Sequence, residues 1–120
     1  MTARRATTQV LPRLRALCLA FPETTETASW GHPNFRAGKK TFAAFEIVGG
    51  RPSIAFHLGP REIARLLRRP EYFVTPYGRG KWVSLWADTA IDWDMVTVLL
   101  RRSYGEVALK RMLAALEGER

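Results

Sequence analysis

The middle of the chain, from Glu23 to Trp86, is divided by glycine and proline into short strand-like runs, and this limits its fold more than any other feature. The runs are residues 25–29, 34–36, 40–47, 53–58, 72–75 and 82–86. Short runs bounded by turn-forming residues are typical of antiparallel strands. The glycine-containing connections at residues 37–39 and 48–51 predict tight hairpin turns, because glycine readily adopts a positive φ.

Helical periodicity flanks and interrupts this block. Apolar residues recur every three or four positions in residues 8–20, which predicts an amphipathic helix with Pro12 in its first turn. Pro60 and Pro70 bracket a short helix within the strand block, since proline suits the first turn of a helix and ends one that precedes it.

The C-terminal third is also predicted to be helical. Asp92 suits the N-cap of a helix, and residues 103–106, Ser-Tyr-Gly-Glu, have the form of a capping box. We therefore expect one helix after Asp92 and a second that starts near Ser103. Helices at both ends of the strand block predict an α+β fold, an antiparallel β-sheet of about five to six strands with helices packed on one face.

The size of the chain and its residue usage predict a single cytoplasmic domain. Its 120 residues suit one domain spanning residues 1–120. The longest apolar run, near Phe21, is far shorter than the ~20 residues that a membrane span needs. No apolar stretch with a cleavage site follows the N-terminal arginines. The single cysteine, Cys18, cannot form an internal disulfide and lies in the apolar stripe of the first helix, so a buried thiol is expected.

The chain is strongly basic. Nineteen Lys and Arg residues against eleven Asp and Glu residues give a formal net charge of +8. A positive field of this size favours polyanions, nucleic acid foremost, over an anionic membrane surface. The cations expected to contact phosphates lie in two turns and on a short helix: Arg36, Lys39, Lys40, Arg79 and Lys81, and Arg61, Arg65, Arg68 and Arg69. Solvated turns and helix faces have the same composition, so the alternative is that these charges serve only solubility.

Aromatic residues interleave with these charges. In residues 82–86 the alternation places Trp82 and Trp86 on one face of a strand and Val83 on the other. If helices cover the valine side, the tryptophans are available to stack on bases or to line a pocket; in the alternative, both belong to the core. Trp30 and Phe35 flank His32 and raise the same question. The candidate pocket residues are Trp30, His32, Phe35, Trp82 and Trp86.

Signatures of catalysis and metal binding are missing from the sequence. No G-x-S-x-G elbow, Walker-type phosphate loop or H-E-x-x-H motif occurs. The two histidines, His32 and His57, have no cysteine partner at the spacing of a zinc site, and a structural role in a Gly-His-Pro turn is favoured for His32. The sequence therefore predicts no catalytic residue, no metal and no cofactor.

Several short motifs resemble those of the MmcQ/YjbR family. They are W-G-H-P-N-F-R at residues 30–36, K-T-F-A at 40–43, L-G-P at 58–60, Y-G-R-G-K-W-V at 77–83 and S-Y at 103–104. They occur in the family's order over nearly the whole chain, although the usual Gly-Trp-Val appears as Lys-Trp-Val with the glycine one place earlier. The resemblance implies a CyaY-like α+β fold and DNA binding through hairpins described as a double wing. It implies no catalytic residues.

Two functions remain open. The first is a non-enzymatic DNA-binding domain that contacts phosphates with little sequence specificity. The second is a module that binds a small ligand or a protein in an aromatic cleft near Trp30, His32 and the tryptophans of residues 82–86. A basic surface continuous across both turns and the arginine-rich helix favours the first, and an apolar pocket with a few polar groups favours the second.

Overall fold

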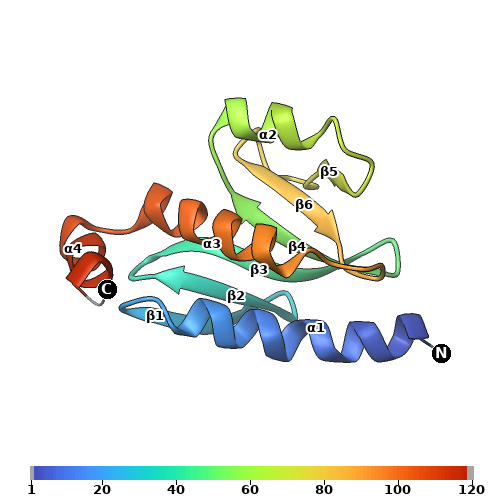
Figure 1. Ribbon diagram of the computed structural model, residues 1–120, viewed down its shortest axis with the longest axis horizontal. Helices are drawn as coiled ribbons and strands as arrows, with labels where there is room; N and C mark the ends of the chain where they lie inside the picture. The colour runs from blue at the N-terminus through green and yellow to red at the C-terminus, as the bar shows by residue number, and fades with distance from the viewer. Residues whose placement is uncertain (1, 119–120) are drawn as a thin grey trace.

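The computed structural model describes residues 2–118, with side chains from Gln9 onward, as four helices and six strands (Figure 1). The helices are α1 (Thr2–Leu19), α2 (Pro60–Leu66), α3 (Trp93–Val107) and α4 (Lys110–Gly118). The strands are β1 (Thr24–Ser29), β2 (His32–Ala37), β3 (Lys40–Val48), β4 (Arg51–His57), β5 (Tyr72–Val74) and β6 (Trp82–Trp86).

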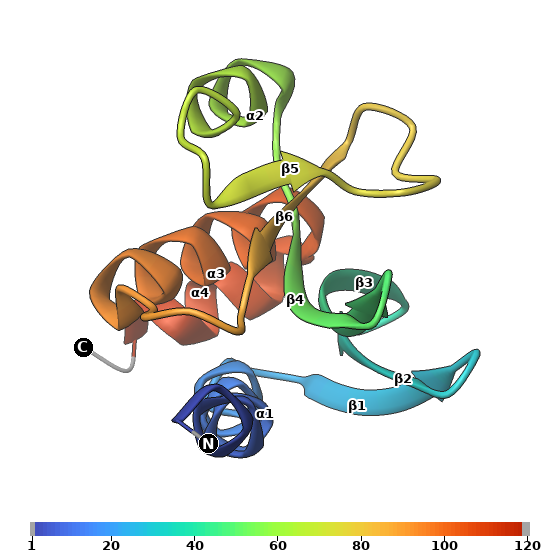
Figure 2. The same cartoon turned by 90° about the vertical axis from the view of Figure 1, so that its right-hand side faces the viewer.

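The strands form one sheet in the order β1-β2-β3-β4-β6-β5, and every neighbouring pair is antiparallel. Figure 2 shows α1, α3 and α4 gathered on one side of this strongly twisted sheet, while α2 lies beyond the β5 and β6 edge. Within residues 2–118, the opposite face of the sheet carries no helix. The predicted α+β fold, with helices at both ends of the strand block, is confirmed.

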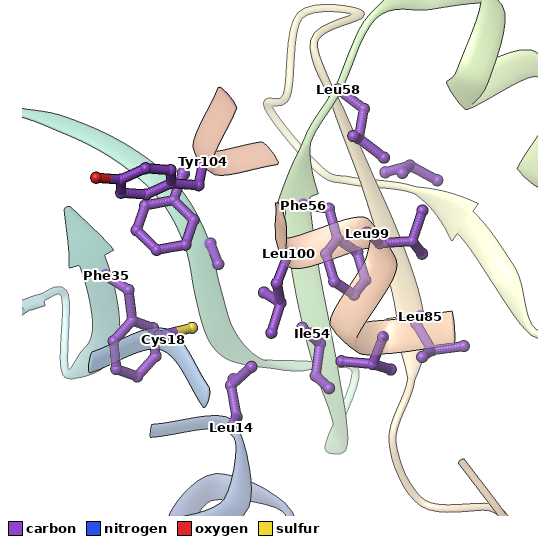
Figure 3. Close-up of a cluster of buried hydrophobic side chains, with 14 of the residues drawn as sticks. Leu14, Cys18, Phe35, Ile54, Phe56, Leu58, Leu85, Leu99, Leu100 and Tyr104 are labelled. Carbon is purple, nitrogen blue, oxygen red and sulfur yellow. The ribbon is translucent and has the colours of Figure 1, made fainter. Parts of the chain in front are cut away.

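The main core lies between the sheet and α1 and α3 (Figure 3). In the sheet, Ile54 pairs with Leu85 and Phe56 with Val83, so alternate residues of β4 and β6 point to the helices. Leu14, Cys18, Leu99 and Leu100 meet them from α1 and α3, each at most 1% exposed. Burial raises the pKa of the Cys18 thiol, which makes it unreactive, as the apolar stripe predicted.

Tyr104 ties α3 to the connection between α1 and β1. Its ring is fully buried, stacks on Phe21 at a centroid distance of 4.8 Å, and meets the ring of Phe42 edge-on at 5.5 Å. Its hydroxyl donates to the carbonyl oxygen of Pro22 at 2.8 Å. One side chain therefore joins α3, the connection between α1 and β1, and β3.

A β-bulge in β3 changes which residues face the helices. The pairing of β2 with β3 shifts between Phe35 and Arg36, which leaves Phe42 as an extra residue of β3. Phe42 and Ala43, although adjacent, are both fully buried, and Phe42 packs on the helix side. Thr41 and Ala44, on either side of the pair, consequently share the helix-free face.

The helix boundaries differ from the sequence expectation in two places. The helix expected over residues 8–20 already begins at Thr2, so Pro12 lies in its interior instead of its first turn. The helix restart expected at Ser103 is wrong, because α3 continues to Val107 and α4 starts at Lys110. Ser103 is fully buried, so the apolar stripe of α3 outweighs the local capping signal. The N-cap at Asp92 is confirmed, since its carboxylate accepts a hydrogen bond from the backbone N–H of Met95 at 3.1 Å.

Candidate functional site

A hollow in the helix-free face of the sheet is built on a row of small residues. Ala44 of β3 pairs with Ala55 of β4, and Ala55 pairs with Ser84 of β6. Longer side chains stand in the rows on either side, among them Glu46 and Trp82. Short side chains between long ones leave a pocket of about 620 Å³.

The pocket rim comes from the β1–β2 turn and from residues 75–78 of the β5–β6 connection. Figure 2 shows both segments projecting to the side of the sheet that lacks helices. Trp30 and Tyr77 lie on these segments and are 95% and 99% exposed. Exposed apolar side chains that gather around a groove are typical of a binding site.

The β1–β2 turn holds Trp30 by a backbone conformation that its side chain disfavours. Ser29 pairs with His32, so Trp30 and Gly31 form a two-residue loop, with φ of 56° and 79°. Two positive φ values define a type I′ turn, in which the first position favours asparagine. His32, expected within a turn, is instead the first residue of β2.

Residues 75–81 form two consecutive tight turns. The N–H of Gly78 donates to the carbonyl of Thr75 at 3.0 Å, and the N–H of Lys81 to that of Gly78 at 3.1 Å. Tyr77 has φ of 62°, which points to a type II turn with Pro76 before it. Gly78 is needed for space, because a Cβ there would lie 2.8 Å from the Cβ of Trp82. The connection is therefore a defined structure that fixes Tyr77 and Trp82 relative to each other.

Glu46 is the carboxylate of the pocket. Burial raises its pKa above the ordinary value, and His32 nearby works in the opposite direction. No group among residues 9–118 donates a hydrogen bond to its side chain. Asn34, a second lining residue, uses its amide N–H on the carbonyl of His32 at 3.2 Å. The Glu46 carboxylate thus offers two acceptor oxygens to a ligand.

The structure brings three of the five candidate pocket residues together. Trp30, His32 and Trp82 line the pocket. Phe35 does not, because it points to the helices and is fully buried in the core. Trp86 lies outside the pocket and stacks on Phe73, with 3.9 Å between the two ring centroids.

The other partner of Trp86 is Arg51, whose guanidinium lies 3.9 Å from the indole ring. Arg51 also makes a two-bond ion pair with Asp88, at 2.7 and 2.9 Å. With both ring faces covered, Trp86 has no face left for a ligand. The tryptophans of β6 therefore lie opposite the core, as one alternative held, but only Trp82 reaches the pocket.

Sequence reasoning did not single out Asn34, Glu46 or Tyr77 as pocket residues. Tyr77 stands between Pro76 and a glycine, and that turn signature could have marked it as exposed. Glu46 and Asn34 share the helix-free face of neighbouring strands only through the bulge in β3, which no local pattern indicated.

The two basic turns emerge from the same end of the sheet. Because neighbouring strands alternate in direction, the β2–β3 turn, the end of β4, the start of α2 and the β5–β6 connection share this end. His57, the last residue of β4, lies there with its Nδ1 buried and unpartnered. Burial lowers the pKa of His57, the carboxylate of Glu106 opposes this, and Lys81 and Lys40 add to the lowering, so both turns act on one imidazole.

The cations at this end have few carboxylate partners. The exposed ones are Lys39, Lys40, Arg61, Arg79 and Lys81, and Arg36 is half-buried. None of these makes an ion pair among the described side chains. Arg69, which pairs with Glu71 at 3.1 Å, lies at the opposite end of β6, where Tyr72 pairs with Leu85. We call the cations of the two turns, Arg36, Lys39, Lys40, Arg79 and Lys81, the basic end.

The arginine-rich helix is shorter than the sequence suggested. The helix α2 ends at Leu66, so Arg68 and Arg69 lie in the turn that follows it. Only Arg61 and Arg65 are on the helix itself. The four arginines are exposed, but they do not form one helical face.

Elsewhere, arginines form ion pairs with several carboxylates. Arg15 pairs with Glu26, and Arg111 with Glu23, each through two hydrogen bonds between 2.6 and 2.9 Å. Arg102 pairs with Glu62. Within residues 2–118, no cluster of three or more His, Cys, Asp or Glu side chains is arranged to hold a metal. In the same stretch, no helix is long and apolar enough to cross a membrane.

The fold and its surface define an α+β domain with an open antiparallel sheet, a hollowed helix-free face and one basic end. The YjbR family profile matches residues 19–106, from the end of α1 to near the end of α3, and the chain belongs to this family.

Two solved structures share the fold. The Deinococcus radiodurans protein DR2400, a DUF419 domain, superposes with a TM-score of 0.73 at 19% identity, covering 89% of this chain and 87% of that one. A Pseudomonas syringae protein, Northeast Structural Genomics Consortium target PsR293, gives a TM-score of 0.58 at 15% identity, covering 68% and 85%. A comparison with curated proteins gives no match.

Proposed function

We propose that this YjbR-family domain is a non-enzymatic DNA-binding protein that contacts phosphates through its basic end, with little sequence specificity. The observation that carries the proposal is the convergence of the two basic turns at one end of the sheet. Their exposed cations have no carboxylate partner among the described residues. Such side chains can replace the counterions of a phosphate backbone, which is the main source of non-specific affinity for DNA.

The distribution of carboxylates supports this proposal over a purely solubilising role. Glu23, Glu26 and Glu62 are paired with arginines of the helices, so they do not neutralise the turns. A solubilising surface would be expected to mix charges of both signs. The basic end instead keeps an excess of one sign.

The test is binding to a labelled DNA duplex, followed by fluorescence anisotropy over a series of salt concentrations. Four to six phosphate contacts predict a slope of log K against log salt of about −4 to −5. Replacing Lys39 and Lys40 with alanine, or Arg79 and Lys81, should weaken binding and make the slope shallower by about one unit for each phosphate that is released. A double Arg101→Ala and Lys110→Ala variant removes the same charge from the helices and should change binding much less.

Binding that is independent of salt, or turn variants that bind like the parent, would contradict the proposal. If only Arg61→Ala and Arg65→Ala variants lose binding, α2 is the contact surface and the turns are not.

A second candidate function is binding of a small ligand or a protein segment in the pocket. A volume of about 620 Å³ lies within the range of small-molecule sites. Three aromatic side chains and a few polar groups line it, which is the usual composition of such sites. Ligand binding that is unaffected by the turn variants would favour this function.

A further inference from the structure

We propose that the pocket binds one unpaired nucleobase, with guanine as the best match, stacked on the rim aromatics and hydrogen-bonded to Glu46. The inference rests on the proposed nucleic-acid function and adds to it a preference for single strands and a base-selective residue. The phosphate attached to the base would lie on cations that adjoin the pocket.

The rim has the features of a stacking platform. Trp30 and Tyr77 lose almost no surface to the rest of the protein, at 95% and 99% exposure. Trp82 lies deeper, and the imidazole of His57 packs edge-on against it at a centroid distance of 5.3 Å. Aromatic side chains along a basic groove bind unpaired bases, because every base presents a π-face for stacking. The pocket volume of about 620 Å³ leaves room for a planar base and its sugar.

Glu46 selects the edge of the base. Its carboxylate has two acceptor oxygens and no donor among the described residues, although burial makes its charged form unfavourable and raises its pKa. A bound ligand with adjacent N–H groups would satisfy both oxygens. Guanine presents two such donors side by side, N1–H and the N2 amino group, whereas adenine and cytosine place an acceptor next to their amino group. The pairing of a carboxylate with this edge is therefore selective.

Two lysines of the basic end lie at the end of the sheet where Thr41 and Trp82 line the pocket. Lys40 directly precedes Thr41, and Lys81 directly precedes Trp82, and both Thr41 and Trp82 line the pocket. Both lysines act electrostatically on His57, which packs on Trp82. The phosphate attached to a base in the pocket would be attracted to these lysines. A strand leaving the pocket would pass onto the basic end.

The experiment measures binding of short labelled oligothymidylates that carry one central dG, dA or dC, together with guanosine monophosphate alone and the duplex. The parent should prefer the dG oligomer over the dA and dC oligomers by roughly tenfold, the scale of one bidentate base contact. Glu46→Gln replaces one acceptor with a donor and should abolish this preference. Glu117→Gln, an exposed carboxylate on α4, is the matched control and should leave it unchanged.

Trp30→Ala and Tyr77→Ala test the stacking. Both side chains are almost fully exposed, so the variants should remain folded. They should weaken binding of all oligomers by several-fold and leave duplex binding within about twofold of the parent, since stacking is sequence-tolerant and serves unpaired bases. Guanosine monophosphate that binds as tightly as the oligomer identifies a free nucleotide as the ligand, and weaker binding identifies a strand.

The outcomes separate this inference from the proposed function. Salt-dependent duplex binding without a dG preference, or with a dG preference that survives Glu46→Gln, overturns the inference and leaves the basic end standing. A dG preference that depends on Glu46, in a protein that does not bind duplex, supports the pocket and overturns the duplex proposal.

Discussion

The two faces of the sheet use the same strands in opposite ways. Toward the helices, β4 and β6 present Ile54, Phe56 and Val83, which are fully buried by packing. On the other face the same strands present Ala55 and Ser84, which are as inaccessible, at 1% and 0% exposure, although none of the described helices covers them. Helices bury the residues of one face. On the other face, longer side chains in the neighbouring rows of the sheet bury the small residues and leave a hollow above them.

This difference separates residues that hold the fold together from residues that shape a site. On the helix-covered face, removing a side chain leaves a cavity inside a close-packed core. On the helix-free face, the shape of the pocket depends on residues that remain small and on turns that keep the rim in place. Substitutions should therefore change stability most on the first face and binding most on the second.

The largest effect is expected for Tyr104→Ala, on the helix-covered face. The fully buried ring contacts Phe21 and Phe42, so its loss should lower the free energy of unfolding by about 3–5 kcal/mol. Tyr104→Phe keeps the ring and loses the hydrogen bond to Pro22, so it should cost only about 1 kcal/mol. Urea unfolding monitored by circular dichroism measures both, and equal losses would show that the ring packing contributes little.

Gly78→Ala tests the helix-free face at a position where the β5–β6 connection packs closely against Trp82. The added Cβ would lie 2.8 Å from the Cβ of Trp82 and 3.1 Å from the backbone oxygen of Thr75, so the turn or the strand must move. We expect a loss of about 1–3 kcal/mol and weaker binding in the pocket. Gly105→Ala, in the exposed last turn of α3 with open space around it, should instead stabilise by about 0.5–1 kcal/mol. Thermal unfolding of the two variants in parallel checks the contrast.

Trp30→Asn should stabilise the protein but remove one of the aromatic side chains of the pocket rim. Asparagine adopts positive φ more readily than tryptophan and is favoured at the first position of a type I′ turn, so a gain of about 1 kcal/mol is expected. The side chain is 95% exposed, so little packing is lost. A rise in the midpoint of urea unfolding is the expected result, and a fall would show that the indole packs on the protein in solution.

The smallest effect is expected for Glu46→Gln and depends on pH. The raised pKa means that the folded protein holds this proton more tightly than the unfolded chain. Stability from this group is therefore greatest at low pH and falls as pH rises through the window between the unfolded and the folded pKa. The glutamine variant should be more stable than the parent above that window and should lose this advantage below about pH 4.5, the ordinary value. Thermal unfolding at several pH values measures the difference, and Glu117→Gln should show no such dependence.

The helix-covered face was the more predictable of the two. Leu14, Cys18 and Leu99 follow a helical period, and β6 alternates, so their burial follows from spacing alone. The prediction failed at Ser103, where a local capping signal competed with a continuous apolar stripe. Arg68 and Arg69 were misplaced by a single helical turn, because periodicity cannot tell where a short helix ends.

The site was predictable only in part. Trp30 and Trp82 stand beside turn signals, and both line the pocket. Glu46 reaches it through a bulge in β3, and Phe35 leaves it because strand alternation turns its ring to the core. Whether a strand residue faces the site depends on register, and register is set by long-range pairing that a single strand does not encode.

The positive φ of two rim residues, and of one arginine of the basic end, has a consequence for directed evolution. Trp30, Tyr77 and Arg79 all hold left-handed backbone conformations that glycine or asparagine would adopt with less strain. A library screened for heat resistance alone should therefore be enriched in such replacements at these three positions. A parallel screen for ligand retention should reject them. Positions at which a replacement raises heat resistance but lowers ligand retention would therefore mark the binding site.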